Sequence, residues 1–211
     1  MNRLHGRKLR HDEILPFLNE IGEELKRHDA TAEMYIGGGA AIAVRHGPGA
    51  RELTDDVDGA FRKNPVVLEV AARIAAREGL QADWVNDKFT GFIPGAQEDT
   101  DATTHQLAAL TVRFASDRFL LAMKMQAGRA KDVADTRLLI RRLGLHRASD
   151  IAELTCDLYG DAAVPAVRYD DMRFHALRML DGIRSVAEPR WPRRDGSGEP
   201  MVLSGVAGFL G

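Results

Sequence analysis

Two aspartates separated by a single residue are the clearest chemical signal in the 211-residue sequence. Asp56 and Asp58 stand in the stretch Thr54-Asp55-Asp56-Val57-Asp58. On a strand, this spacing puts both carboxylates on one face, about 6 to 7 Å apart along the chain. Like charges so close repel unless a cation lies between them, and hard carboxylate oxygens suit Mg²⁺ or Mn²⁺. The spacing indicates a divalent metal site for phosphoryl transfer, and a solvated acidic turn is the alternative.

A run of three glycines precedes this acidic stretch. Gly37, Gly38 and Gly39 follow the short apolar run Met34–Ile36 and come before Ala40–Val44, an order that predicts a strand, a tight turn and a short helix. Because glycine has no Cβ, the backbone N–H groups of such a turn can approach phosphates closely. An ordinary turn is the alternative, since no Walker-type Gly-Lys-Ser/Thr follows.

Lys124 lies within the otherwise apolar run Leu121–Met125. A lysine in this position must either extend to the surface or reach into a cleft, and the second interpretation is favoured here. Asp132 follows within Arg129-Ala130-Lys131-Asp132-Val133-Ala134-Asp135. For Lys131 and Arg137 the pattern favours a solvated helix face.

Together these motifs resemble the AbiEii-like, toxin-related nucleotidyltransferases of minimal type, over roughly residues 33 to 143. The matching patterns are Gly-Gly-x-Ala, then Arg-x-x-Thr-x-Asp-x-Asp from Arg51 to Asp58, then a helical lysine followed by Arg-x-Lys-Asp-x-x-Asp. The resemblance implies that Asp56 and Asp58 bind metal and take part in catalysis with Lys124 and Asp132. It also implies nucleotide binding by Gly37, Gly38, Gly39, Arg51, Thr54 and Lys124.

The implied activity is the transfer of a nucleoside monophosphate from a nucleoside triphosphate (NTP) to a macromolecular acceptor, with Mg²⁺ or Mn²⁺. The acceptor is an RNA end or a protein, and the toxin of a toxin-antitoxin system would have a cognate partner protein. The sequence departs from the pattern in three places: Gly59 follows the second aspartate, Gly39 replaces a Ser or Thr, and residues 107 to 115 contain no acid. These departures motivate the alternative of a weakly active or inactive protein that binds a nucleotide or a partner, including an antitoxin-like role.

Periodicity and turn residues predict the elements that would position these residues. We expect helices over 12–26 with Asp12 as the cap, 40–44, 65–78, 117–125 with Asp117 as the cap, 132–143, 149–159 and 169–186, and strands over 34–36, 54–61 and 107–115. The segment 80–105 is expected to be irregular chain, with Trp84 in the core.

The alternation of these elements predicts a mixed α/β (α+β) protein with a nucleotidyltransferase-like fold, in which a small mixed sheet is flanked by helices and followed by a C-terminal helical extension. The expected organisation is a core over residues 1–145, a helical extension over 146–188 and a flexible or loosely packed tail over 189–211.

Composition excludes several classes of protein. The 29 basic and 31 acidic residues give a net charge of −2, so any contact with a polynucleotide must be local. Cys156 is the only cysteine, and the seven histidines show no paired spacing for a metal. Neither a signal peptide nor an apolar run of roughly 18 residues is evident. We therefore expect a cytoplasmic protein without a membrane partner.

Overall fold

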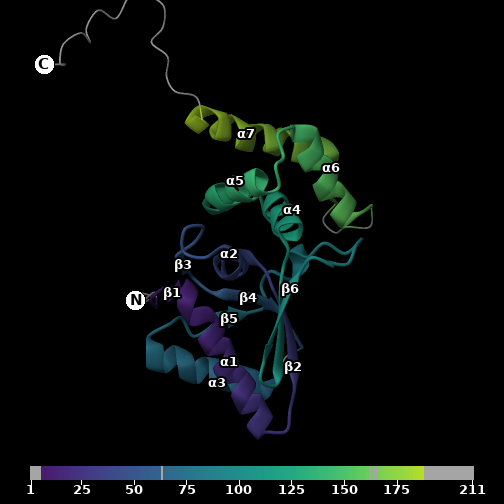
Figure 1. Cartoon of the computed structure of the whole chain (residues 1–211). Coiled ribbons are helices and arrows are strands. Elements are labelled where there is room, and N and C mark those ends of the chain that lie inside the picture. The colour runs from purple at the N-terminus through teal and green to yellow at the C-terminus, as the bar shows by residue number, and fades with distance from the viewer. Residues whose placement is uncertain (1–5, 63, 162, 164–165, 188–211) are drawn as a thin grey trace, which may run out of the picture.

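The fold is built on a five-stranded mixed sheet (Figure 1). The computed structural model describes residues 6–62, 64–161, 163 and 166–187, without the side chains of residues 184–187. The sheet has the order β5 (Val85–Asn86), β4 (Val57–Ala60), β2 (Ala32–Ile36), β7 (Leu110–Phe114) and β6 (Thr103–Leu107). Strand β2 is parallel to β7 and antiparallel to β4, β4 is parallel to β5, and β6 is antiparallel to β7. The protein therefore has the expected mixed α/β architecture.

Three helices pack on this sheet. α1 (His11–Arg27) contacts α3 (Pro65–Glu78), β7 and β6, and α2 (Gly38–His46) contacts α1, β4 and β7. α3 begins and ends as predicted, because the Asn64 side chain accepts a hydrogen bond from the Val66 N–H and Gly79 ends the helix in the left-handed conformation. The predicted cap of α1 is wrong. Asp12 lies inside the helix, and the carboxylate of Glu13 accepts the N–H of Arg10 instead.

Four more helices gather at one end of the molecule (Figure 1). These are α4 (Asp117–Ala127), α5 (Val133–Arg142), α6 (Ala148–Tyr159) and α7 (Tyr169–Ala187), and α6 packs against both α7 and α4. The cap of α4 is Ser116, whose hydroxyl accepts the Phe119 N–H, so the assignment of this role to Asp117 is wrong. Asp132 lies in the short 3₁₀ helix η2 (Ala130–Asp132) that precedes α5.

The strands differ most from expectation. β6 begins within the segment 80–105 predicted to be irregular, and a turn at Ala108, with a φ of 52°, joins it to β7. The strand predicted over 107–115 therefore comprises the end of β6, this turn and β7. The strand predicted over 54–61 is also divided, into β3 (Leu53–Thr54) and β4, and β3 pairs with the two-residue strand β1 (Leu9–Arg10).

One hydrophobic cluster joins the sheet, its covering helices and α4–α7. Trp84 lies in it as expected, fully buried, with its indole N–H donating to the carbonyl of Ala71 at 2.8 Å. None of the described helices is long and apolar enough to cross a membrane. The predicted tail over 189–211 lies outside the described residues.

Candidate functional site

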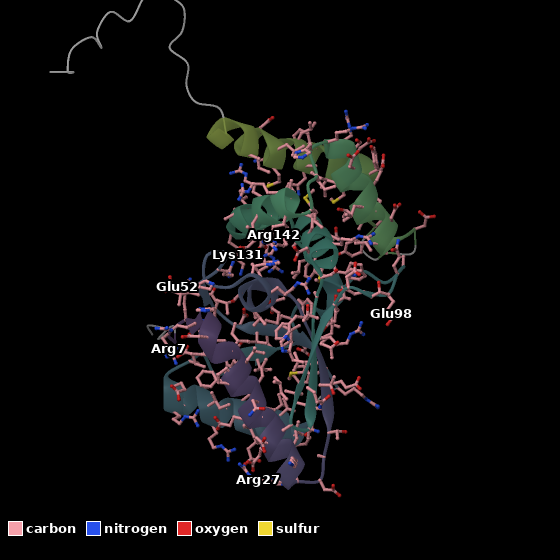
Figure 2. All side chains as sticks on the ribbon, in the orientation of Figure 1. Arg7, Arg27, Glu52, Glu98, Lys131 and Arg142 are labelled. Carbon is pink, nitrogen blue, oxygen red and sulfur yellow. The ribbon has the colours of Figure 1, made fainter. Side chains whose placement is uncertain are left out.

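A cavity of about 240 Å³ lies where the N-terminus of α2, the β3–β4 segment and α4 meet. It is lined by Lys8, Gly38, Gly39, Arg51, Thr54, Asp55, Asp56, Asp58, Phe89, Phe92, Leu120, Met123, Lys124, Ala127, Arg129, Lys131 and Asp132. In Figure 2, Lys131 lies where the helical group meets the sheet part of the molecule. All the residues predicted to form the site line this cavity, with the exception of Gly37.

The glycine run makes room for the side chains of the site. A Cβ on Gly38, which has a φ of 61°, would lie 2.8 Å from Oδ2 of Asp58. A Cβ on Gly39 would lie 2.7 Å from both Nε of Arg51 and Oγ1 of Thr54. These two glycines therefore bring three side chains against the first turn of α2, where backbone N–H groups have no partner within the helix.

Gly37 has a different position from the one predicted for it. It is the N-cap of α2, and its Cα faces the ring of Phe89, which a Cβ would approach to 2.5 Å. Its N–H donates to the backbone carbonyl of Asp58 at 3.0 Å. Gly37 thus packs behind the cavity and joins β2 to β4.

Asp56 and Asp58 lie at the start of β4, and both face the cavity. The amide of Asn86 on β5 donates to Oδ2 of Asp56 at 3.0 Å. Among the described residues, none forms a hydrogen bond or an ion pair with the Asp58 carboxylate. Burial, followed by repulsion from Asp56, raises the pKa of Asp58, although Lys131, Arg129 and Lys88 oppose the shift. The two carboxylates therefore concentrate negative charge on the wall of the cavity.

This arrangement fits a divalent cation. Mg²⁺ is commonly held by one or two carboxylates together with water and substrate phosphate, so a pair of aspartates is a sufficient protein contribution. Within the described part of the chain, no cluster of three or more His, Cys, Asp or Glu side chains is placed to hold a metal. A cation here would therefore take its remaining ligands from solvent or substrate.

Lys124 points inward from α4 and is only 7% exposed. Its ammonium lies 2.7 Å from Oδ1 of Asp132 and 2.9 Å from Oδ2 of Asp135. Arg51 donates to the same oxygen of Asp135 at 2.5 Å. Two cations and two carboxylates thus form one connected group, which satisfies the requirement that buried charges be paired. Lys124 reaches into the cavity, as its position in an apolar run indicated.

Some residues of the site were not singled out from the sequence. Asp135 joins Lys124 to Arg51, whereas in the sequence it stands out only as the last residue of the motif Arg129–Asp135. Lys131 is exposed, as expected, but it also lines the cavity, as does the exposed Arg129. Phe89 and Phe92 also line the cavity, and they come from the segment 80–105, for which the sequence predicts irregular chain. Their contribution depends on tertiary contacts that no local pattern encodes.

Comparison with known proteins found no matching family model, no matching curated protein and no matching solved structure. The function of the cavity must therefore be argued from its own chemistry and from the motifs.

Proposed function

We propose that the protein is a metal-dependent nucleotidyltransferase with a nucleotidyltransferase-like fold, which moves a nucleoside monophosphate from an NTP to an RNA end or a protein. One observation carries the proposal: two motifs about 70 residues apart, at Gly38–Asp58 and Lys124–Asp132, line the same cavity. The motifs supply carboxylates, exposed backbone N–H groups and cations, which are the groups that a triphosphate and its metal require.

Asp56 and Asp58 are the residues that would hold the metal. Mg²⁺ or Mn²⁺ bound there would neutralise charge on the phosphates and activate the attacking oxygen. Asn86 holds one oxygen of Asp56, so that carboxylate keeps a fixed direction. The Gly37-Asp58 backbone hydrogen bond fixes the start of β4 against the glycine turn. The two carboxylates are thus positioned before any cation arrives.

The glycine turn beside these carboxylates suits the triphosphate. The first turn of α2 offers backbone N–H groups and the positive end of a helix dipole. Arg51 and Thr54 lie against this turn, and Lys8, Arg129 and Lys131 add exposed cations around it. The cavity thus offers cationic side chains to a polyanion although the protein has a net charge of −2.

Lys124 and Asp132 complete the site as a pair. In their present geometry the ammonium is bound by carboxylates from η2 and α5. A phosphate oxygen that approaches Lys124 would compete with these carboxylates for its N–H groups. Lys124 is therefore held in place by Asp132 and Asp135 as a donor at the edge of the phosphate site.

Label transfer tests this function. The protein is incubated with each labelled NTP, Mg²⁺ or Mn²⁺, and either total RNA or cell extract. Asp58→Asn should lose at least about a hundredfold in rate, because a bound metal supplies several kcal/mol of stabilisation. Asp12→Asn is the control, since Asp12 is exposed and, among the described residues, forms an ion pair with Arg10 alone. Turnover that is equal in wild type and Asp58→Asn would contradict the proposal.

A second candidate function is supported by two observations. β7 carries no acid on the strand beside β2, and Lys124 is already neutralised by carboxylates. Both are compatible with a protein that binds a nucleotide or a partner without turnover, including an antitoxin-like role. NTP binding that Asp58→Asn weakens, without label transfer to any acceptor, would favour this candidate.

A further inference from the structure

The cavity has an apolar side that metal and phosphate chemistry does not use. Phe89, Phe92, Leu120, Met123 and Ala127 form it. Phe89 is buried and stacks on Tyr35, with ring centroids 6.5 Å apart and planes inclined by 18°. Phe92 is only partly buried, so an aromatic ring in this cavity remains available to a ligand.

Arg129 lies against the Phe92 ring, with its guanidinium carbon 5.2 Å from the ring centroid. No residue in the described part of the chain forms an ion pair with this guanidinium. Together, the two side chains form what we call the Phe92-Arg129 wall, in which a guanidinium lies over an aromatic ring. Such surfaces bind flat, polarisable rings, since both Arg planes and aromatic faces stack on nucleobases.

Rigid elements hold this wall. The Tyr159 hydroxyl, at the end of α6, donates to the backbone carbonyl of Phe92, and Tyr159 is itself buried. Arg129 follows Gly128, which ends α4 in the left-handed conformation with a φ of 57°. The position of the wall is therefore set by α4 and α6 rather than by a free loop.

We infer that the Phe92-Arg129 wall binds the nucleobase of the nucleoside triphosphate, with Phe89, Leu120 and Met123 as the apolar floor. The inference rests on the proposed function, because it concerns the base of the same nucleotide whose phosphates the first turn of α2 would bind. Every base has a π face, so stacking of this kind tolerates all four bases.

The test separates the base from the phosphates. Affinities for each of the four NTPs and for inorganic tripolyphosphate are measured by calorimetry in the presence of Mg²⁺. In wild type the NTPs should bind more tightly than tripolyphosphate. In Phe92→Leu this advantage should shrink roughly tenfold for every base, which is the size of a single stacking contact, while affinity for tripolyphosphate stays unchanged.

Two variants serve as controls. Phe92→Tyr keeps a ring and should keep the advantage, which guards against a loss caused by misfolding. Phe61→Leu alters another partly buried phenylalanine, one that lines a groove on the sheet rather than the cavity, and should leave all affinities unchanged.

The remaining outcomes would contradict the nucleobase site alone or the proposed function as well. If Phe92→Leu keeps the full advantage of NTPs over tripolyphosphate, the base lies elsewhere and the inference is wrong, although the proposed function stands. The same conclusion follows if wild type binds tripolyphosphate as tightly as every NTP. If wild type binds neither class of ligand, the proposed function fails together with the inference.

Discussion

The Asp58 carboxylate is partly buried in the wall of the cavity, beside the carboxylate of Asp56. Burial and the nearby charge of Asp56 raise its pKa, and no described side chain donates a hydrogen bond to it. A carboxyl group with a raised pKa holds its proton more tightly in the folded protein than in the unfolded chain. Its contribution to stability is therefore present below the unfolded pKa and is lost as the pH rises through the folded pKa.

Asp58→Asn should therefore stabilise the metal-free protein at neutral pH. In EDTA at pH 7 the variant should melt at a higher temperature than wild type, and the difference should close as the pH falls toward about 4, near the pKa of an unperturbed aspartate. Thermal unfolding followed by circular dichroism measures both. Mg²⁺ should then raise the melting temperature of wild type but not of the variant, because only wild type keeps both ligands.

Asp12→Asn is a control, because the pKa of Asp12 is shifted in the opposite direction to that of Asp58. The hydrogen bond from Arg10 lowers the pKa of Asp12, so its ionised form favours the folded state at neutral pH. This variant should melt no higher than wild type at pH 7. A rise equal to that of Asp58→Asn would show that loss of any negative charge, rather than of this one, stabilises the protein.

Gly38 allows a second test at a single residue. Gly38→Ala should destabilise the protein by about 1–2 kcal/mol or more, because the left-handed conformation disfavours a side chain and the new methyl would meet the Asp58 carboxylate. Denaturant unfolding measures the loss. Gly144→Ala is a matched control, since Gly144 has a φ of 64° and open space around it.

The comparison of the two alanine variants isolates the contact with Asp58. Gly38→Ala should also weaken Mg²⁺ binding, whereas Gly144→Ala should leave it unchanged. Equal effects of the two variants on stability and on metal binding would mean that the close approach of Asp58 to Gly38 has no role in the site.

Among the elements, α4 is joined to η2 and α5 by the charges around Lys124. Because this ammonium is 7% exposed, its removal leaves the largely buried Asp132 carboxylate without its partner, and leaves Asp135 with Arg51 alone. Lys124→Met should therefore lower the free energy of unfolding by about 3–5 kcal/mol. Chemical denaturation measures this change. An unchanged free energy of unfolding would mean that the carboxylates reach solvent or another cation.

Lys88→Met is the matched control for this prediction. Lys88 also pairs with an aspartate, Asp83, but both side chains are more than half exposed. Surface pairs of this kind contribute little, so the variant should unfold as wild type does.

Helices with local start and stop signals could be predicted closely from the sequence. α3 has Asn64 and Pro65 at its start and Gly79 at its end, so its bounds follow from single residues. β6 could not be predicted in this way, because Thr103 to Leu107 carries mostly polar, exposed side chains and exists as a strand through its pairing with β7. The caps of α1 and α4 were each misplaced, since an adjacent polar residue fitted the same pattern.

The candidate site likewise contains some features that the sequence predicts and others that only tertiary packing produces. The positions of Asp58 and Gly38 could be anticipated, because both belong to one short motif whose parts meet across β2 and β4. The pairing of Arg51 with Asp135 could not, since the two residues are 84 positions apart and meet only when α5 packs beside the cavity. Phe92 likewise gains its setting from Arg129 and Tyr159, which lie on other elements.

At the scale of the whole molecule, the hydrophobic core is continuous from the sheet to the terminal helices. Ile151 and Leu158 on α6, with Met179 and Leu180 on α7, belong to the same cluster as the residues of the sheet. α6 also holds the Phe92 wall through Tyr159. The helices after residue 145 are thus part of the environment of the cavity.

Removal of these helices should therefore destabilise the rest. A fragment of residues 1–145 exposes the faces of α4 and α5 that contact α6 and α7, so it should unfold at lower denaturant concentration and less cooperatively than the full chain. Urea unfolding followed by the fluorescence of buried Trp84 measures this, with Trp191→Phe in the full chain so that both proteins carry one tryptophan. A fragment that unfolds cooperatively at the same midpoint would instead support an independent domain ending near residue 145.

The close fit of Gly39 against Arg51 and Thr54 limits how the sequence can change during evolution. Position 39 requires glycine only while Arg51 and Thr54 keep their present size, because a Cβ there would lie 2.7 Å from Nε of Arg51 and from Oγ1 of Thr54. A lineage that shortened Arg51 or Thr54 would be free to acquire alanine or serine at position 39. The three positions should therefore change together in descendants of this gene, and a glycine retained beside two small neighbours would need another explanation.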